Sequence, residues 1–262
     1  MIPISLEGKI ALVTGASQGI GWAVAQKLAE AGATCVLVAR NEELLKEKAA
    51  LLSSGYRQRH LFFSADMSDN DQVDQLIGFV KQQLPVHILV NNSGGPKPGL
   101  IQQASPADFT AALQQHIGTA QRLLQALLPA MKEEQYGRVL NIISTSVRIP
   151  IANLGVSNTT RAAMASWAKT WSNEVASFGI TVNNLLPGLT QTQRLTSLIT
   201  SEAQRLQTTE KQVTENMLQT IPAKRFGDPE ELANLACFLA SPLAAYINGV
   251  SIAVDGGRTG TI

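Results

Sequence analysis

With 21 basic and 20 acidic side chains, the chain of 262 residues has a formal net charge of +1 and no basic run, which argues against a nucleic-acid partner or an anionic membrane surface. Hydrophobic residues make up 45% of the sequence, yet no apolar run is long enough to cross a membrane, and the amino-terminal MIPISLEGK lacks the features of a secretory signal. We therefore expect a cytoplasmic globular protein with room for one large α/β domain.

Strand and helix signals alternate along the chain. The predicted strands are Lys9–Val13, Thr34–Ala39, Leu61–Ser64, Val86–Val90, Arg138–Ile143, Ile180–Leu186 and Val250–Val254. The first predicted helix begins after Gly21. The others cover Asn41–Ser54, Asp69–Gln83, Ser105–Glu133, Ser157–Phe178 and Asp228–Ala240. This alternation predicts a doubly wound parallel sheet, a Rossmann fold of about seven strands with helices on both faces, in a single domain over residues 1–262.

The stretch Thr190–Lys224 interrupts the alternation. It is polar, rich in Gln and Thr, and contains only scattered apolar residues. We expect short helices outside the sheet, and the position beyond the carboxyl end of a strand predicts a substrate lid over residues 190–224. A helical excursion that merely packs on the surface is an equally good interpretation.

The two cysteines, Cys35 and Cys237, fall in a predicted strand and a predicted helix. We expect both to be small buried residues in a reducing compartment, with a disulfide as the lesser alternative. The three histidines, His60, His87 and His116, lack the spacing of metal ligands, so no metal site is predicted.

A glycine-rich segment, Thr14–Gly21 (TGASQGIG), joins the first predicted strand to the first helix. Glycines allow a sharp turn and let the backbone approach a phosphate, while the helix N-terminus offers free N–H groups to the anion. The spacing GxxxGxG is weak evidence by itself, because a turn needing positive φ would also use it. The flanking strand and helix favour a dinucleotide site.

Residues at the ends of later strands refine the cofactor prediction. The second strand ends in Ala39-Arg40, where a carboxylate would select a ribose 2′-hydroxyl and a guanidinium can hold a 2′-phosphate, so NADP(H) is favoured over NAD(H). Asp66 is a candidate acceptor for an adenine amino group, or an ordinary turn residue. The run Asn91–Gly94 combines amides that can bridge strands with a glycine that permits close approach to a ligand.

Together the segments TGASQGIG, NNSGG, GRVLNIIS, FGITVNNLLPGLTQT and RFGDPEELANLACFLA…YINGVSIAVDGG resemble the short-chain dehydrogenase/reductase (SDR) family, and most of all its 3-oxoacyl-(acyl carrier protein) reductases. The resemblance runs from Leu6 to Gly257. It implies that the following residues contact the cofactor: Gly15, Ser17, Gly19, Ile20, Arg40, Asp66, Met67, Asn92, Gly94, Arg161, Pro187, Gly188 and Thr192.

The catalytic residues that the resemblance implies are largely replaced. The family uses an Asn-Ser-Tyr-Lys tetrad, of which the serine falls on Ser144, while the Tyr and Lys of YxxxK fall on Ser157 and Arg161 and the Asn falls on His116. An aliphatic hydroxyl is a far poorer acid than a phenol, whose pKa is about 10 and can be lowered by a nearby cation. Arg161 can still hydrogen-bond a ribose, with a permanent charge and a different geometry from lysine.

His116 is a candidate substitute for the missing phenol. Imidazole suits proton transfer near neutral pH, so we hypothesise that His116 replaces the tyrosine, through Ser157 or a water molecule. The alternative, which is more common for a lone histidine on a helix, is a hydrogen-bonded core or interface residue.

The function predicted from these residues is an NADP(H)-dependent oxidoreductase that interconverts a ketone and a secondary alcohol, with Ser144 orienting the carbonyl. Two alternatives stay open: a catalytically impaired NADP-binding protein with a sensing or scaffold role, and a non-redox lyase or isomerase on the same fold. The family also implies a homotetramer or dimer, with Trp167 and Trp171 either at the subunit contact or in the core.

Overall fold

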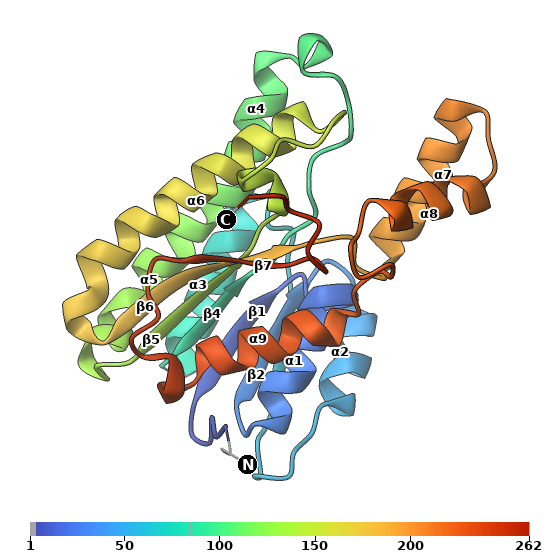
Figure 1. Ribbon diagram of the computed structural model, residues 1–262. Helices are drawn as coiled ribbons and strands as arrows, with labels where there is room; N and C mark the ends of the chain where they lie inside the picture. The colour runs from blue at the N-terminus through green and yellow to red at the C-terminus, as the bar shows by residue number, and fades with distance from the viewer. Residues whose placement is uncertain (1–3, 84, 262) are drawn as a thin grey trace.

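A seven-stranded parallel sheet forms the centre of the computed structural model, which describes residues 4–83 and 85–261 (Figure 1). The strands follow the order β3-β2-β1-β4-β5-β6-β7. Their bounds are β1 Ile10–Thr14, β2 Thr34–Ala39, β3 Leu61–Ser64, β4 Ile88–Asn91, β5 Gly137–Ile142, β6 Ile180–Pro187 and β7 Ser251–Val254. The sheet confirms the predicted doubly wound Rossmann fold. Two strands, β2 and β3, have the predicted bounds, and the ends of the others lie within two residues of the predicted ones.

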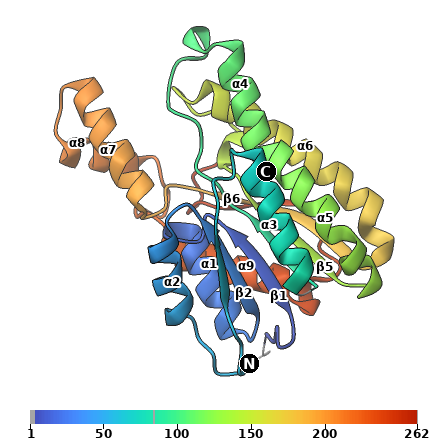
Figure 2. The ribbon, with the colours of Figure 1, turned by 180° about the vertical axis from the view of Figure 1, so that it is seen from behind.

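Helices cover both faces of this sheet. Their bounds are α1 Gly19–Glu30, α2 Glu42–Leu51, α3 Asn70–Gln83, α4 Pro106–Leu113, α5 Thr119–Glu133, α6 Gly155–Val175, α7 Gln193–Leu206, α8 Glu210–Gln219 and α9 Pro229–Ala240. On the face seen in Figure 1, α1 and α9 bury Leu28 and Ala236 against the sheet. On the opposite face, seen in Figure 2, α3, α5 and α6 bury Leu76, Leu124 and Ala168. The two buried faces explain why the strands are almost uninterrupted apolar runs.

The predicted helix Ser105–Glu133 contains a local irregularity. Ser105 is its N-cap, accepting a hydrogen bond from the Asp108 N–H, as the sequence predicts. Between α4 and α5, however, residues Gln114–Gly118 form a π-helical turn that carries His116. A π turn adds one residue and so rotates α5 by about 100° relative to α4, and the sequence analysis, which predicts one uninterrupted helix, missed this offset.

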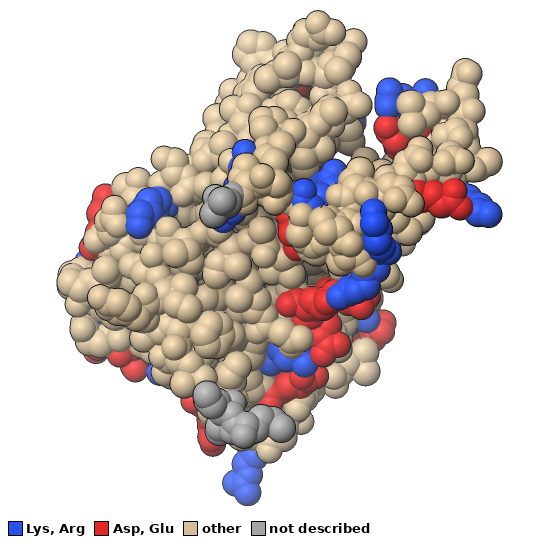
Figure 3. Space-filling view, viewed as in Figure 1, with Lys and Arg blue, Asp and Glu red and all other residues tan. Residues whose placement is uncertain are grey.

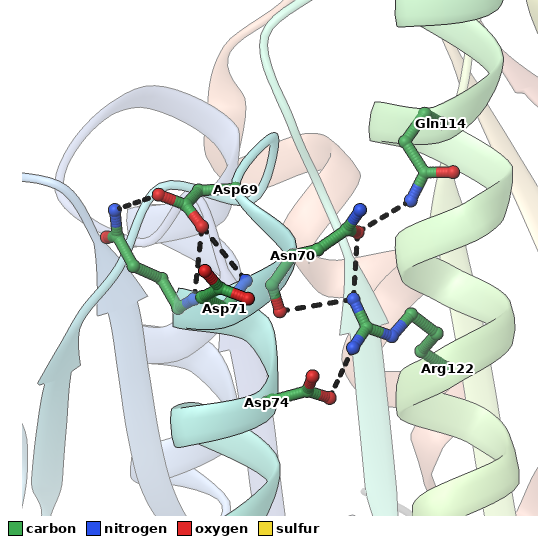
Figure 4. A network of polar contacts seen from close by, with 7 residues as sticks. Asp69, Asn70, Asp71, Asp74, Gln114 and Arg122 are labelled. Atoms are coloured by element: carbon green, nitrogen blue, oxygen red, sulfur yellow. Dashed lines mark hydrogen bonds and ion pairs between the residues drawn. The ribbon is translucent and has the colours of Figure 1, made fainter.

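A polar network fastens this π turn to α3 (Figure 4). The Asn70 Oδ1 atom accepts hydrogen bonds from Gln114 Nε2 at 2.8 Å and from Arg122 Nη1 at 2.8 Å. Arg122 also pairs with Asp74 on the next turn of α3. The network therefore holds the wide turn, and with it His116, at a fixed position above the sheet.

The segment predicted to leave the sheet does so. Residues 190–224 form α7 and α8, which project from the body of the molecule at the right of Figure 1. Thr192 caps α7 by accepting a hydrogen bond from the Leu195 N–H, and Thr209 caps α8 in the same way from Gln212. A threonine therefore caps the start of each of these two helices.

Both cysteines are free and buried, as predicted. Burial raises the pKa of the Cys35 thiol to about 12, which fits a small apolar residue rather than a reactive thiol. Among the residues that the structure describes, no helix has the length and apolar character needed to cross a bilayer, and no cluster of metal-ligating side chains occurs.

Candidate functional site

The carboxyl ends of the parallel strands meet at one edge of the sheet, and the strand order reverses between β1 and β4. In open α/β sheets a crevice forms at such a point, and ligands bind there. The glycine-rich segment leaves β1 at this crevice and enters α1.

Three glycines shape this segment for different reasons. Gly15 and Gly19 have φ angles of +61° and +57°, which favour glycine. Gly21 has an ordinary helical φ, but a Cβ there would lie 2.2 Å from the Gly15 carbonyl oxygen and 2.5 Å from Asn92 Nδ2. The backbone is therefore packed too closely for any other residue at position 21. The N-terminus of α1 begins at the crevice, and no side chain caps it.

Asn92, at the end of β4, fixes the turn from the other side. Its Nδ2 donates to the Gly15 carbonyl oxygen at 3.1 Å and to the Thr14 carbonyl oxygen at 3.3 Å. Its backbone N–H donates to Thr14 Oγ1 at 2.9 Å. Asn92 thus bridges β1 and β4, as the run of amides predicts.

The bridging continues from Asn91 across the sheet to Asn141 and Asn184, two residues that the sequence analysis did not single out. Asn91 Nδ2 donates to Asn141 Oδ1 at 2.9 Å, and Asn141 Nδ2 donates to Asn184 Oδ1 at 2.9 Å. The three asparagines stand opposite one another in the register of β4, β5 and β6. Their row of side-chain hydrogen bonds could be predicted only from the strand pairing. It fixes the carboxyl ends of three strands relative to each other, directly below the site.

A cavity of about 830 Å³ opens above these strand ends. Its lining brings together the following predicted site residues: Ser144, Ser157, Arg161, Ile20, Asn92, Pro187, Gly188 and Thr192. Ser144 follows β5, and Ser157 lies in the first turn of α6 with Arg161 one turn further on. Helix α7 closes the far side with Leu195 and Leu198, so residues 190–224 form one wall of the cavity.

The other predicted residues lie outside this lining: Gly15, Ser17, Gly19, Arg40, Asp66, Met67, Gly94 and His116. Gly15, Ser17 and Gly19 belong to the glycine-rich segment, and Met67 is buried, with its carbonyl oxygen accepting from Thr119 Oγ1 at 2.8 Å. Gly94 lies between Ser93 and Gly95, which do line the cavity.

Arg40 and Asp66 lie at the ends of the neighbouring strands β2 and β3. Arg40 is exposed, and its carbonyl oxygen accepts from Ser64 Oγ at 3.0 Å. One carboxylate oxygen of Asp66 accepts from the Ser68 N–H at 2.9 Å and from its hydroxyl at 2.7 Å, and these bonds lower the pKa of Asp66. One carboxylate oxygen of Asp66 therefore stabilises a local turn. The other accepts no hydrogen bond from the residues that the structure describes.

Arg161 is buried although it carries a full charge. Its Nη1 donates to the Ile142 carbonyl oxygen at 3.1 Å and its Nη2 lies 3.5 Å from the Ser93 carbonyl oxygen. Burial, together with the charge of Arg194, lowers the pKa of Arg161 to about 10. No carboxylate pairs with it among the described residues, so a buried cation is held next to Ser144 and Ser157 by backbone oxygens alone.

His116 lies behind the cavity wall. Its Nδ1 is 2.7 Å from the Ser93 Oγ, and its buried Nε2 has no hydrogen-bond partner in the described part of the chain. Burial, with Arg161 and Arg194 nearby, lowers the pKa of His116 to about 3. The imidazole is therefore neutral at pH 7 and holds no imidazolium proton to supply, and Ser93 is its one hydrogen-bond partner among the described residues.

The lowered pKa of His116 leads to a prediction about the pH dependence of stability. The pKa of His116 in the folded protein lies below the unfolded value of 6.5, so as the pH falls the unfolded chain takes up a proton at this histidine before the folded protein does. The stability that the neutral imidazole contributes is therefore complete above pH 6.5 and is lost as the pH falls toward 3. We expect the free energy of unfolding to fall by about 2 kcal/mol less between pH 7 and pH 5 in His116→Gln than in the native chain. Urea unfolding of both proteins at the two pH values measures this, and equal falls would contradict the buried neutral imidazole.

None of the three tyrosines lines the cavity. Tyr136 lies between Lys9 and Arg138 and donates its hydroxyl to the Ala240 carbonyl oxygen, while Tyr246 is fully exposed. The cavity is therefore formed without a phenol.

Comparisons with known proteins agree with this geometry. The sequence model of a protein family described as enoyl-(acyl carrier protein) reductase matches residues 15–259. The 3-oxoacyl-[acyl-carrier-protein] reductase FabG of Vibrio harveyi is 34% identical over 257 residues, covering 97% of this chain and 98% of its own. The Escherichia coli FabG is 33% identical over the same shares of each chain. The chain belongs to the short-chain dehydrogenase/reductase family.

Two solved structures share this fold over nearly the whole chain. L-sorbose reductase from Gluconobacter frateurii, solved with NADPH and L-sorbose, has a TM-score of 0.93 at 32% identity and full coverage of both chains. YwfH, an NADPH-dependent reductase involved in bacilysin biosynthesis, has a TM-score of 0.92 at 30% identity, covering 97% of this chain and 99% of that one. These relatives and neighbours are oxidoreductases, and this SDR is an oxidoreductase of the same family.

Proposed function

We propose that this SDR is an NADP(H)-dependent reductase or dehydrogenase that interconverts a ketone and a secondary alcohol on a small or acyl-chain substrate. The observation that carries the proposal is the convergence of Ser144, Ser157 and Arg161 on one cavity, next to a crevice whose backbone has the form of a phosphate cradle. The relatives act as 3-oxoacyl reductases, and two structural neighbours use NADPH, which supports the same reaction class here.

The crevice fits a dinucleotide. The N–H groups at the start of α1, which no side chain caps, would hold the pyrophosphate, and Arg40 the 2′-phosphate of the adenosine half. Asn92, Gly94, Pro187, Gly188 and Thr192 would flank the nicotinamide half. When bound, the cofactor supplies or accepts the hydride, and every other task falls to residues of this chain.

Ser144 and Ser157 would orient the substrate carbonyl by hydrogen bonds from their hydroxyl groups. The buried guanidinium of Arg161 would stabilise negative charge as it develops on the carbonyl oxygen, since a fixed cation in a low-dielectric site is effective there. With no phenol at position 157, the proton would come from water, directly or through His116 and Ser93. We expect slow native turnover, because a tuned general acid typically contributes ~10²–10⁴-fold.

Residues 190–224 would act as a substrate lid. Thr192, at the N-cap of α7, lies beside the glycine-rich segment, since a Cβ added to Gly19 would lie 3.3 Å from Thr192 Cγ2. Movement of α7 would therefore open the cavity and the cofactor crevice together.

We also propose a homotetramer or dimer, as the family implies. In the single chain, Trp167 and Trp171 are half-buried, and both donate from Nε1 to Gln121 Oε1 on α5, at 2.7 and 2.9 Å. Their indoles thus belong partly to the core between α5 and α6, and their outer edges are available to a second subunit.

The proposed function is tested by measuring NADPH binding and then NADPH oxidation with a panel of ketones and 3-oxoacyl thioesters. Saturable binding with oxidation of at least one carbonyl compound supports it. Binding without turnover on any compound favours a sensing or scaffold role, for which the absence of a phenol in the cavity is the specific observation. Conversion of a substrate without net NADPH consumption would favour a lyase or isomerase.

Arg40 makes the cofactor preference testable. We expect Arg40→Asp to weaken NADPH binding at least about tenfold, since a charge-assisted hydrogen bond to the phosphate is lost and a like charge is introduced. Binding of NADH should stay constant or improve, because a carboxylate can accept from the ribose hydroxyls. Fluorescence titration with both nucleotides gives the ratio, and equal weakening of both would contradict the assigned role.

A further inference from the structure

The cavity is strongly basic, although the chain as a whole is almost neutral. Four arginines line it, Arg161, Arg194, Arg205 and Arg258, with Glu202 as the one carboxylate among its lining residues. Basic side chains are visible in the hollow between the lobe that carries α4 and the lobe of α7 and α8 (Figure 3). A cavity for a neutral substrate has no need of this excess of positive charge.

The four guanidinium groups are not equivalent. Arg205 is neutralised by Glu202, with its Nε and Nη2 donating to the two carboxylate oxygens at 2.8 and 2.5 Å. Arg258 donates from Nε to Thr220 Oγ1 at 3.2 Å. Arg161 is held by backbone oxygens, as described above. The guanidinium of Arg194 has neither an ion pair nor a hydrogen bond with any residue that the structure describes.

Arg194 projects from the first turn of α7 across the cavity toward β4. A Cβ on Gly95 would lie 2.8 Å from Arg194 Nη2 and 3.5 Å from Arg161 Nη2, so both guanidinium groups lie beside the same glycine. Two like charges at this place repel each other, and the charge of Arg194 contributes to the lowered pKa of Arg161 and of His116. An anion between them would relieve that repulsion.

The cofactor phosphates do not account for Arg194. The pyrophosphate cradle lies at Gly15–Gly21, on the β1 side of the crevice, and Arg40 stands at the end of β2. Gly95 follows β4 on the other side, next to Ser93 and in the same cavity as Ser144 and Ser157. Arg194 therefore faces the part of the cavity where the reacting carbonyl would lie.

We propose that the substrate of this SDR is an anionic carbonyl compound or alcohol, and that Arg194 binds its carboxylate or phosphate group. The inference rests on the proposed function for the reacting carbonyl, but the anion site itself can be tested by binding alone. Since Arg194 stands on α7, the same contact would draw the proposed lid onto the substrate.

The experiment compares charged and neutral probes that are otherwise alike. Calorimetry of the native protein saturated with NADP⁺ measures the binding of 2-oxohexanoate, 5-oxohexanoate and dihydroxyacetone phosphate, and of their neutral counterparts, the two methyl esters and dihydroxyacetone. The oxo acids vary the distance between carbonyl and charge, and the phosphate arm separates the two kinds of anion. NADPH oxidation is followed with the same compounds.

We expect at least one anionic probe to bind more tightly than its neutral counterpart, and Arg194→Gln to weaken that anion about 10- to 100-fold while leaving the neutral probe and NADPH within about threefold. Arg194→Lys should recover part of the affinity, because it keeps the charge. Arg59→Gln is the matched control: Arg59 is exposed near the amino end of β3, away from the cavity, and its loss should change nothing.

Three results would overturn the anion site: equal binding of charged and neutral probes, no saturable binding of any anionic probe at millimolar concentrations, or an Arg194→Gln variant that loses NADPH by the same factor as the anion, which would make Arg194 a cofactor ligand. Anion binding that depends on Arg194, with no NADPH oxidation on these compounds or on any of the ketones and 3-oxoacyl thioesters, would uphold this site while contradicting the proposed function.

Discussion

Ser157→Tyr combined with Arg161→Lys is expected to raise NADPH-dependent turnover by ~10²–10⁴-fold on a carbonyl compound that the native protein reduces slowly. The two positions lie one helical turn apart on α6, and both line the cavity beside Ser144. A phenol at 157 has a pKa of about 10, which a lysine one turn away lowers toward neutrality. The pair would therefore restore a general acid to a cavity that is otherwise in place.

The matched control is Ser157→Phe with Arg161→Lys, which fills the same volume without a hydroxyl group. We expect the Phe variant to bind NADPH like the Tyr variant and to gain no turnover. Only the Tyr variant should show a pH profile with a group titrating between neutrality and pH 10. Equal rates in the two variants, or a native rate already as high as that of the Tyr variant, would contradict the idea that the missing phenol limits catalysis.

The fold was predictable because its signals are local and repeated. Each buried strand reads as a short apolar run, and capping residues such as Asn41 and Ser105 mark helix starts that the structure confirms. The π turn at Gln114–Gly118 was not predictable, since it follows from packing of α5 against α3 and from hydrogen bonds such as that from Thr119 Oγ1 to the Met67 carbonyl oxygen.

The sequence located cavity residues where they are tied to a backbone feature or to a family motif, as Ser144, Ser157 and Arg161 are. The glycines were predicted because a strand-turn-helix requires them near a phosphate, and Asn92 because it belongs to a run of amides at the end of a strand. The contact of His116 with Ser93 and the approach of Arg194 to Arg161 each join separate segments of the chain, so no local pattern indicates them. For Arg194, the polar composition of residues 190–224 gives no sign of the approach. The position of Arg194, two residues after Thr192, was the one available hint, and it acquires meaning only when α7 is placed over β4.

Gly21→Ala is expected to abolish high-affinity binding of NADPH, raising its Kd at least about 100-fold, through the loss of two or more hydrogen bonds to a charged phosphate. The added methyl group would lie 2.2 Å from the Gly15 carbonyl oxygen and 2.9 Å from its carbon, so the turn or the start of α1 must move. That movement also disrupts the hydrogen bond from Asn92 Nδ2 to Gly15, and we expect the free energy of unfolding to fall by about 3 kcal/mol.

Gly78→Ala provides the control, since Gly78 lies within α3 and a Cβ there meets no atom within 4 Å. The same substitution at that site should stabilise the protein by about 0.5–1 kcal/mol, because alanine is the better helix former, and should leave NADPH binding unchanged. Urea unfolding and fluorescence titration of the two variants separate close packing at the crevice from a general effect of alanine. A Gly21→Ala protein that is stable and binds NADPH like the native chain would remove the glycine-rich segment from the cofactor site, because no cradle of this shape could accommodate the methyl group unchanged.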